Sequence, residues 1–200
     1  EDGIISQMVA LPSNMFITVT LPATLWFFDR AKKKKDEILF IDARNIYTQV
    51  DRALRKFSDE QIKNLAIITR LYEGDSESFY ELIKEYEVSR EKAETEEEKK
   101  YFQKQIDWLL ERFPDGKYQD VTGLCKVAKL EGEDGIRDQD YSLNPGRYVG
   151  VVIEDDGLTA EEFKEKIYGL NDEFKELNKE AKELEEKIAN NLDKLVIEYE

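Results

Sequence analysis

The sequence predicts an α+β protein that is mostly helical, in which a few strands come first and a long helix comes last. Three patterns lead to this fold class. Apolar runs between turn residues fill the start of the chain, apolar residues at helical spacing follow, and a four-and-three repeat occupies the end. We expect strands over residues 1–45, a helical region over 46–157 whose part 117–157 is irregular, and a coiled-coil-like helix over 158–200.

Strands are expected in three apolar runs, which are Ile4–Leu11, Ala23–Phe28 and Glu37–Asp42. The basic run Lys32–Lys35 forms the turn before the last of them. The runs are continuously apolar, which is typical of strands that are covered on both faces in an α/β sheet. So few residues cannot supply that cover themselves. We therefore expect these strands to complete a larger, Rossmann-like sheet.

Helical spacing starts at Ile46 and continues to Phe57 on one apolar face. Two capping boxes predict helices over Ser58–Gly74 and Thr95–Phe113. In a capping box the side chain of a Ser or Thr accepts the backbone N–H of an acidic or amide residue three positions on, and the side chain of that residue accepts the backbone N–H of the Ser or Thr. A further helix is expected through Phe79–Tyr86. The segment after it, up to Gly157, is rich in turn residues, and within it we expect a short strand at Tyr148–Ile153.

The C-terminal repeat is the most regular signal in the chain. Thr159 with Glu162 forms a third capping box, and apolar residues then recur every four and three positions. We name these residues the seam: Phe163, Ile167, Leu170, Phe174, Leu177, Ala181, Leu184 and Ile188. A narrow stripe of this kind suits one partner helix in another subunit. A helix that packs back on its own domain is the alternative.

Composition excludes several classes of protein. The chain has 200 residues with 45 acidic and 30 basic side chains, a net charge of −15 and a pI near 4.6. Free-standing binding to a phosphate backbone needs a basic surface, so it is not expected. No apolar run reaches the length of a membrane span. The single cysteine, Cys125, predicts a protein without an internal disulfide and without a cysteine metal site. Together with the lack of a visible signal peptide, it predicts a cytoplasmic location.

Catalytic motifs are missing from this sequence. It contains no histidine, which removes Ser-His-Asp and Cys-His catalysis. It also contains no Gly-x-Ser-x-Gly, no phosphate-binding Gly-x-x-x-x-Gly-Lys and no Gly-x-Gly-x-x-Gly. We therefore expect no catalytic residue in the chain. Its first strand also follows Glu1 and Asp2 directly, without an initiator methionine or a cap, which suggests a cut within a domain.

Several segments together resemble a known family. They are Val9–Phe16, Pro22–Phe28, Ile38–Arg44, Gly123–Ala128 and Asp140–Gly150. In this order and spacing they resemble the C-terminal part of the modification subunit of type I restriction–modification systems, an N6-adenine-specific DNA methyltransferase. Leu-Phe-Ile-Asp-Ala-Arg and Asn-Pro-Gly-Arg-Tyr-Val-Gly are specific in combination. The strands would then finish the methyltransferase catalytic sheet.

The resemblance implies transfer of a methyl group from S-adenosylmethionine to N6 of a flipped adenine. That chemistry needs an Asn/Asp-Pro-Pro-Phe/Tyr turn and a Gly-rich turn after the first strand, and both are missing here. In the family these turns lie upstream of the strand that opens this chain. The chain is therefore expected to be a C-terminal fragment that binds no cofactor and is inactive alone, although its parent is an enzyme.

The resemblance also suggests DNA-facing residues. Phe16 occupies the place of an aromatic residue that stacks on the extruded base, and the alternative is an ordinary phenylalanine that closes the sheet. Arg147 is a candidate for a phosphate contact. The alternative is that it lies in a tight turn and pairs with a nearby carboxylate. Lys33 and Lys34 are further candidates for DNA contact. The alternative is that they lie in a solvated turn.

In the family, two modification subunits clamp the DNA together with one specificity subunit, which reads the sequence, so the fragment is expected to serve assembly and DNA clamping. The resemblance therefore implies both partners, with DNA bound only in the assembled complex. The candidate interface residues are those of the seam with large side chains: Phe163, Ile167, Leu170, Phe174, Leu177, Leu184 and Ile188. A stand-alone acidic helical adaptor is the competing hypothesis. An adaptor should bury its first strands, whereas a methyltransferase tail should expose an apolar sheet edge around Ile4–Leu11.

Overall fold

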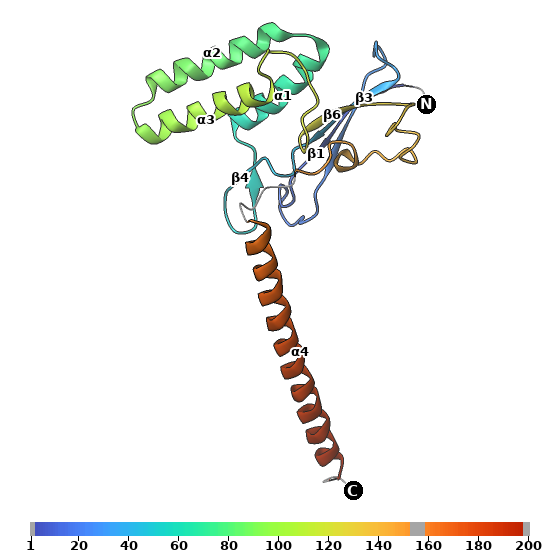
Figure 1. Ribbon diagram of the computed structural model, residues 1–200. Helices are drawn as coiled ribbons and strands as arrows, with labels where there is room; N and C mark the ends of the chain where they lie inside the picture. The colour runs from blue at the N-terminus through green and yellow to red at the C-terminus, as the bar shows by residue number, and fades with distance from the viewer. Residues whose placement is uncertain (1–2, 153–158, 198–200) are drawn as a thin grey trace. The chain divides into compact units, whose positions relative to one another are not determined.

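The computed structural model describes residues 3–152 and 159–197. The chain divides into two compact units, residues 1–152 and 153–200. The first unit holds a small mixed sheet and three α-helices, and the second holds one helix, α4 (Ala160–Ile197) (Figure 1). The architecture is mixed α/β, and the expected strands within residues 1–45 and the expected long helix near the end are present. No helix in the described ranges is long and apolar enough to cross a membrane.

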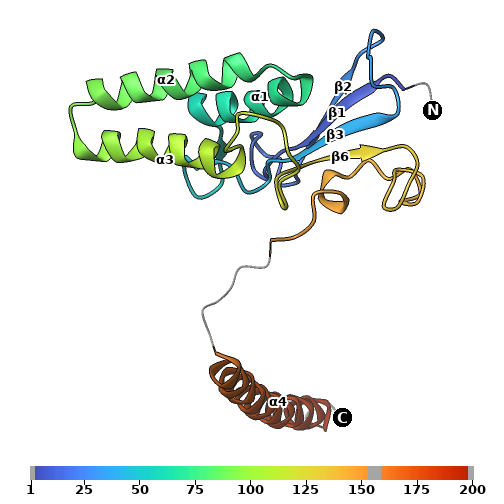
Figure 2. The same ribbon diagram turned by 45° about the horizontal axis from the view of Figure 1, so that its top comes forward.

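The main sheet has four strands in the order β2-β1-β3-β6 (Figure 2). They are β1 (Ile5–Ala10), β2 (Thr24–Phe28), β3 (Glu37–Asp42) and β6 (Cys125–Lys129). Only β1 and β3 run parallel, and the two outer pairs are antiparallel. The three N-terminal strands are confirmed, while a Rossmann-like continuation of this sheet remains a prediction.

Alternation along β1 and β3 sends side chains to two separate cores. Val9 and Ile41 belong to a cluster shared with the helices. Met8 and Phe40 point to the other face, where Phe40 stacks on Tyr148 with ring centroids 4.0 Å apart. β1 and β3 are therefore covered on both faces, as their continuous apolar runs predicted.

Helices α1 (Asp59–Glu73), α2 (Ser76–Lys92) and α3 (Glu96–Arg112) pack together beside the sheet (Figure 2). Both capping boxes predicted inside this unit are formed. The hydroxyls of Ser58 and Thr95 each accept the backbone N–H three residues on, and the side chain there accepts the N–H of the cap residue. Local sequence therefore fixes where α1 and α3 begin.

A buried polar network connects the three helices. The Tyr86 hydroxyl donates to Oδ1 of Asn64 at 3.0 Å, and Nδ2 of Asn64 donates to Oε1 of Gln105 at 2.9 Å. Burial raises the pKa of Tyr86, so the hydroxyl keeps its proton. The network fixes the mutual register of α1, α2 and α3, because a shift would leave buried polar atoms without partners.

The helix predicted from Ile46 to Phe57 is wrong. The segment forms a small hairpin of β4 (Thr48–Gln49) and β5 (Arg55–Lys56). The carboxylate of Asp51 accepts the backbone N–H two residues on, and the backbone N–H of Val50 donates to the carbonyl of Leu54, directly before β5. Such local bonds favour a turn over a helix, so the helical spacing of apolar residues was coincidental here.

The irregular segment 117–157 contains two elements that sequence analysis missed. One is β6, which pairs with β3, and the other is a 3-10 turn at Pro145–Arg147. The strand predicted at Tyr148–Ile153 is wrong for residues 148–152, and Ile153 lies outside the described residues. Tyr148 and Val149 are buried without forming a strand. As loop residues they belong to the same apolar cluster as Phe40 and Met8, which explains the apolar pattern of the segment.

The exposed edge is β2, not β1 as predicted. β1 lies inside the sheet, and every residue of β2 is exposed. Leu25 and Phe27, on the helix side, are 43% and 41% exposed, and Trp26 and Phe28, on the other side, are 50% and 60% exposed. The expectation of cover on both faces therefore fails for β2. Its composition is that of an interior strand, whereas its position is an edge.

Candidate functional site

The carboxyl ends of β1 and β3 lie side by side, because the two strands are parallel and Ala10 pairs with Asp42. In open α/β sheets ligands bind beyond the carboxyl ends of the strands. The loop after β1 carries Phe16, and the residues after β3 include Arg44. This end of the sheet is therefore the candidate functional site.

Phe16 lies on a loop that is fixed at its base and exposed at its tip. Arg55 holds the base, since its backbone N–H donates to the carbonyl of Asn14 at 2.8 Å and its Nη1 donates to Oγ of Ser13 at 2.9 Å. At the tip the side chain of Phe16 is 50% exposed and that of Ile17 is 81% exposed. An exposed ring on an anchored loop can stack on a base, and that role remains a prediction.

Asp42 and Arg44 form a close ion pair that sequence analysis did not select. Nε of Arg44 donates to both carboxylate oxygens of Asp42, at 2.9 and 3.0 Å, and Nη2 donates at 2.6 Å. The hydrogen bond to Asp42 raises the pKa of Arg44. Asp42 is buried, so it fixes the direction of a guanidinium that stays half exposed. The signal was an Asp and an Arg two residues apart at a strand end.

A groove of about 590 Å³ lies beside this pair. Residues from the end of β1, from β2 and from the loop 141–144 line it together with Arg44, among them Thr24, Trp26, Tyr141 and Asn144. Its guanidinium, aromatic rings and amide are the groups that contact nucleotides in proteins. These groups offer hydrogen bonds and stacking surfaces, so the groove is suited to binding.

The predicted DNA-contact residues do not all meet at this end. Arg147 is exposed and follows Gly146, where an added Cβ would lie 2.5 Å from Nη2 of Arg44. Lys33 and Lys34 instead lie in the turn before β3, at the opposite end of the sheet. There Nζ of Lys34 sits 4.0 Å from the ring centroid of Tyr72. The structure therefore places Gly146, the neighbour of Arg147, against Arg44 and separates the lysines from Phe16.

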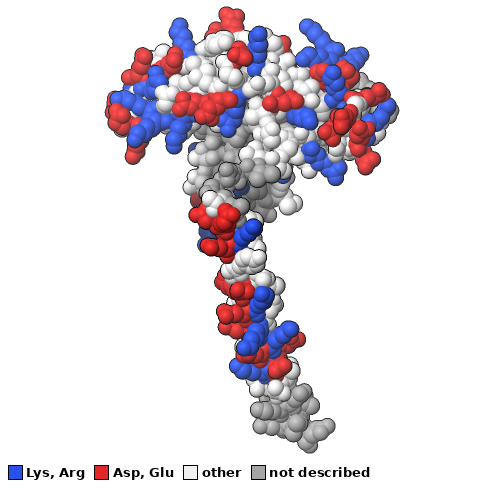
Figure 3. Space-filling model, in the orientation of Figure 1, with Lys and Arg blue, Asp and Glu red and all other residues white. Residues whose placement is uncertain are grey.

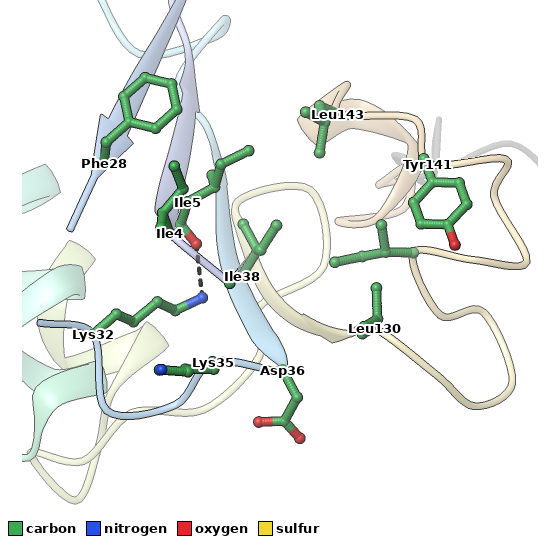
Figure 4. A pocket seen from close by; sticks show the side chains of 12 residues that line it. Ile4, Ile5, Phe28, Lys32, Lys35, Asp36, Ile38, Leu130, Tyr141 and Leu143 are labelled. Carbon is green, nitrogen blue, oxygen red and sulfur yellow. Dashed lines mark hydrogen bonds between the residues drawn. The ribbon is translucent and has the colours of Figure 1, made fainter. Parts of the chain in front are cut away.

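Lys32 is a buried lysine that the sequence analysis treated as part of a solvated turn. It is 8% exposed, and its Nζ donates to the carbonyl of Ile5 at 2.7 Å (Figure 4) and also to the carbonyl of Glu37. Burial lowers its pKa, and the nearby carboxylates Asp36, Glu37 and Asp29 oppose that shift. Lys32 also borders an apolar cavity of about 300 Å³. Because it bonds the amino ends of β1 and β3, we interpret it as structural.

Cys125 is fully buried in β6, as expected for a small apolar residue. Burial raises the pKa of its thiol to about 11. In the described part of the chain no three Cys, Asp or Glu side chains cluster to hold a metal ion.

The residues at this end do not fit S-adenosylmethionine. The loop between β1 and β2 and the segment between β3 and β4 contain no glycine. A Gly-rich turn is what lets a backbone approach such a cofactor closely. These two segments therefore lack the Gly-rich turn that would allow such an approach.

The seam lies on helix α4, in the second unit. Phe163, Leu170 and Phe174 are 51%, 53% and 64% exposed, and the other seam residues are exposed as well. The predicted capping box is formed, since the backbone N–H of Glu162 donates to Oγ1 of Thr159 at 3.3 Å and the Thr159 N–H donates back at 2.8 Å. A helix of this kind offers one long apolar face to a partner.

Comparison with known proteins gives a consistent result. Residues 1–91 match the family described as N-6 DNA Methylase. The methylase subunit of the type I restriction enzyme HindI from Haemophilus influenzae is 34% identical over 94% of this chain and 32% of its own length. The MjaIX methylase subunit from Methanocaldococcus jannaschii is 30% identical over 98% of this chain and 27% of its own length. The chain thus spans about a third or less of these curated relatives.

One solved structure is also similar. The methyltransferase subunit of a type I restriction–modification system from Streptococcus thermophilus aligns with 76% of this chain and 21% of its own chain. The TM-score is 0.42 and the sequence identity is 16%.

Proposed function

We propose that this chain, a homologue of type I restriction methylase subunits, forms the C-terminal part of an N6-adenine DNA methyltransferase. In this proposal β1, β2 and β3 extend a catalytic sheet, the loop of Phe16 faces the flipped adenine, and α4 serves assembly. The methyl donor, S-adenosylmethionine, would be held by residues outside this chain.

The observation that carries the proposal is the exposure of β2. An edge strand with the sequence Thr-Leu-Trp-Phe-Phe exposes apolar side chains on both faces and leaves its outer backbone groups unpaired. Soluble proteins protect edges with charges, prolines or short strands, and β2 has none of these features inside it. A neighbouring strand of the same catalytic domain would cover it. This exposure supports the methyltransferase hypothesis over a stand-alone adaptor, for which the first strands should be buried.

The proposal is tested by adding the sequence that precedes Glu1 in the same reading frame. We expect it to encode an Asn/Asp-Pro-Pro-Phe/Tyr turn and a Gly-rich turn. The extended protein, assembled with its specificity subunit, should transfer labelled methyl groups to adenine N6, and the 200-residue chain alone should transfer none. A reading frame without both motifs would contradict the proposal.

Phe16 offers a test of the base-stacking role. In the extended and assembled enzyme, Phe16→Ala should lower methylation by roughly tenfold to a hundredfold, because stacking on a base contributes about 1–3 kcal/mol. Phe16→Trp should restore most of the activity. Ile17→Ala, one position along the same exposed tip, is the matched control and should have little effect. Equal losses from both alanine variants would contradict the role.

We further propose that the seam binds a helix of the specificity subunit. Its large apolar side chains are exposed along α4, and a face of this length is stabilised by one partner helix. The double substitution L170E/L177E places charges in the middle of that face. It should abolish co-purification with the specificity subunit while leaving the helical content of the chain unchanged in circular dichroism. Unchanged assembly would contradict this part of the proposal.

A further inference from the structure

The charges that flank the seam carry information about its partner. The seam follows a seven-residue repeat, and two lines of residues border it. The first flank is made of the residues directly before every second seam residue, starting at Ile167: Lys166, Glu173, Glu180 and Lys187. The second flank is made of the residues directly after the remaining seam residues, starting at Phe163: Lys164, Asn171, Asn178 and Glu185. Figure 3 shows an uncharged strip along α4 beside patches of both charge signs. In coiled coils such flanking charges set partner choice and orientation.

A second copy of α4 fits the seam poorly in the antiparallel arrangement. The register that covers the whole seam pairs Phe163 with Ile188 of the other copy. In that register the first flanks face each other, so Lys166 meets Lys187 and Glu173 meets Glu180, each pair occurring twice by symmetry. On the second flank only Lys164 meets an opposite charge, Glu185. Like-charged contacts therefore outnumber opposite-charged contacts by about two to one, and they oppose this dimer.

The parallel arrangement of two copies is also unfavourable. There each first-flank residue meets the second-flank residue five positions further along the other copy. Glu180 then meets Glu185, while Lys166 and Glu173 meet the neutral Asn171 and Asn178. No pair of opposite charges forms, and one pair of like charges forms on each side. Both registers that cover the whole seam thus disfavour self-association.

We propose that the seam is built to exclude a second copy of this chain and to accept a helix of a different chain. That helix carries acidic residues opposite Lys166 and Lys187 and basic residues opposite Glu173 and Glu180. The choice of the specificity subunit as owner of this helix rests on the proposed function. The exclusion of a second copy rests only on the sequence and exposure of α4.

Exchanging two charges tests the exclusion in the full chain. The substitutions E180K/K187E leave the net charge unchanged and turn every like-charged pair of the antiparallel register into an opposite-charged pair. The variant should form a dimer whose association constant exceeds that of the parent chain by about tenfold or more, as measured by sedimentation equilibrium. K179E/E186K makes the same exchange on the outer face of α4 and should leave the association constant unchanged.

The exposed edge of β2 can also join two copies, so each variant is compared with the same variant carrying L170E/L177E. The added glutamates should remove the extra dimer of E180K/K187E and should not change the association of the parent. If they reduce association of the parent to a similar extent, the seam accepts a second copy and the inference is wrong. The inference also fails if E180K/K187E associates no more strongly than K179E/E186K.

The partner is tested separately with purified specificity subunit. E180K/K187E should weaken binding by about tenfold, whereas K179E/E186K should bind as the parent does. Equal binding of all three proteins, combined with loss in L170E/L177E, would overturn the charge complementarity and leave the proposed function intact. If the parent does not bind the specificity subunit at all, the proposed assembly role fails, and the sedimentation result still decides whether the seam excludes a second copy.

Discussion

Phe40→Ala will lower the free energy of unfolding of the first unit by about 3–5 kcal/mol. Phe40 is fully buried in the interior strand β3, where its ring stacks on Tyr148 and packs against Met8. Removal of the ring leaves a cavity that the sheet cannot close, because β3 is paired on both sides. A domain of this size is stable by about 5–15 kcal/mol, so the variant should be close to unfolding. Urea denaturation followed by circular dichroism measures the change.

Trp26→Ala is the matched control for that experiment. Trp26 is the larger side chain and lies on the same sheet face, but it belongs to β2 and is 50% exposed. In the isolated chain its removal should cost less than about 1 kcal/mol. If both variants lose the same stability, the assignment of β2 as the exposed strand is wrong. In the complete subunit, where we propose that β2 is covered, the cost of Trp26→Ala should rise.

The Cys125 thiol will react with a disulfide reagent at pH 8 at least about a hundredfold more slowly in the folded chain than in urea. Burial raises its pKa from 9.0 to about 11, so little thiolate is present, and the side chain is inaccessible. The unfolded chain has an ordinary, accessible thiol. Absorbance of the released thiolate measures both rates. A rate in the folded chain close to that in urea would mean that β6 is not held in the sheet.

The same shift makes stability depend on pH in a defined direction. The folded pKa lies above the unfolded value, so the stabilisation is complete below about pH 9 and is lost as the pH rises toward 11. The loss attributable to Cys125 is on the order of 2–3 kcal/mol. Buried tyrosines such as Tyr118, whose pKa is also raised, titrate at high pH as well. The difference between the parent and Cys125→Ala over pH 8–11 therefore isolates the thiol.

Sequence alone determined the elements whose signals are local. The capping boxes at Ser58, Thr95 and Thr159 each involve atoms three residues apart, and all three form as predicted. The seam of α4 also follows from spacing within one helix. The resemblance to type I modification subunits likewise came from the order of short motifs, and the comparisons agree with it.

Tertiary structure decided whatever depends on contacts between distant segments. β6 is a strand because it pairs with the free edge of β3. Its own sequence is too short and too polar to predict a strand. Lys32 and Lys34 belong to one basic run, yet only Lys32 is buried, because the carbonyls of Ile5 and Glu37 meet there. The close contact of Arg44 with Gly146 likewise joins residues about a hundred positions apart.

The strand β2 shows most directly how the two kinds of information divide. Its sequence determined that it is apolar throughout and therefore suited to the interior of a sheet. Only the order β2-β1-β3-β6 showed that it lies at an edge with both faces exposed. A residue's hydrophobicity is a property of its side chain, whereas its burial depends on which other segments reach it in space.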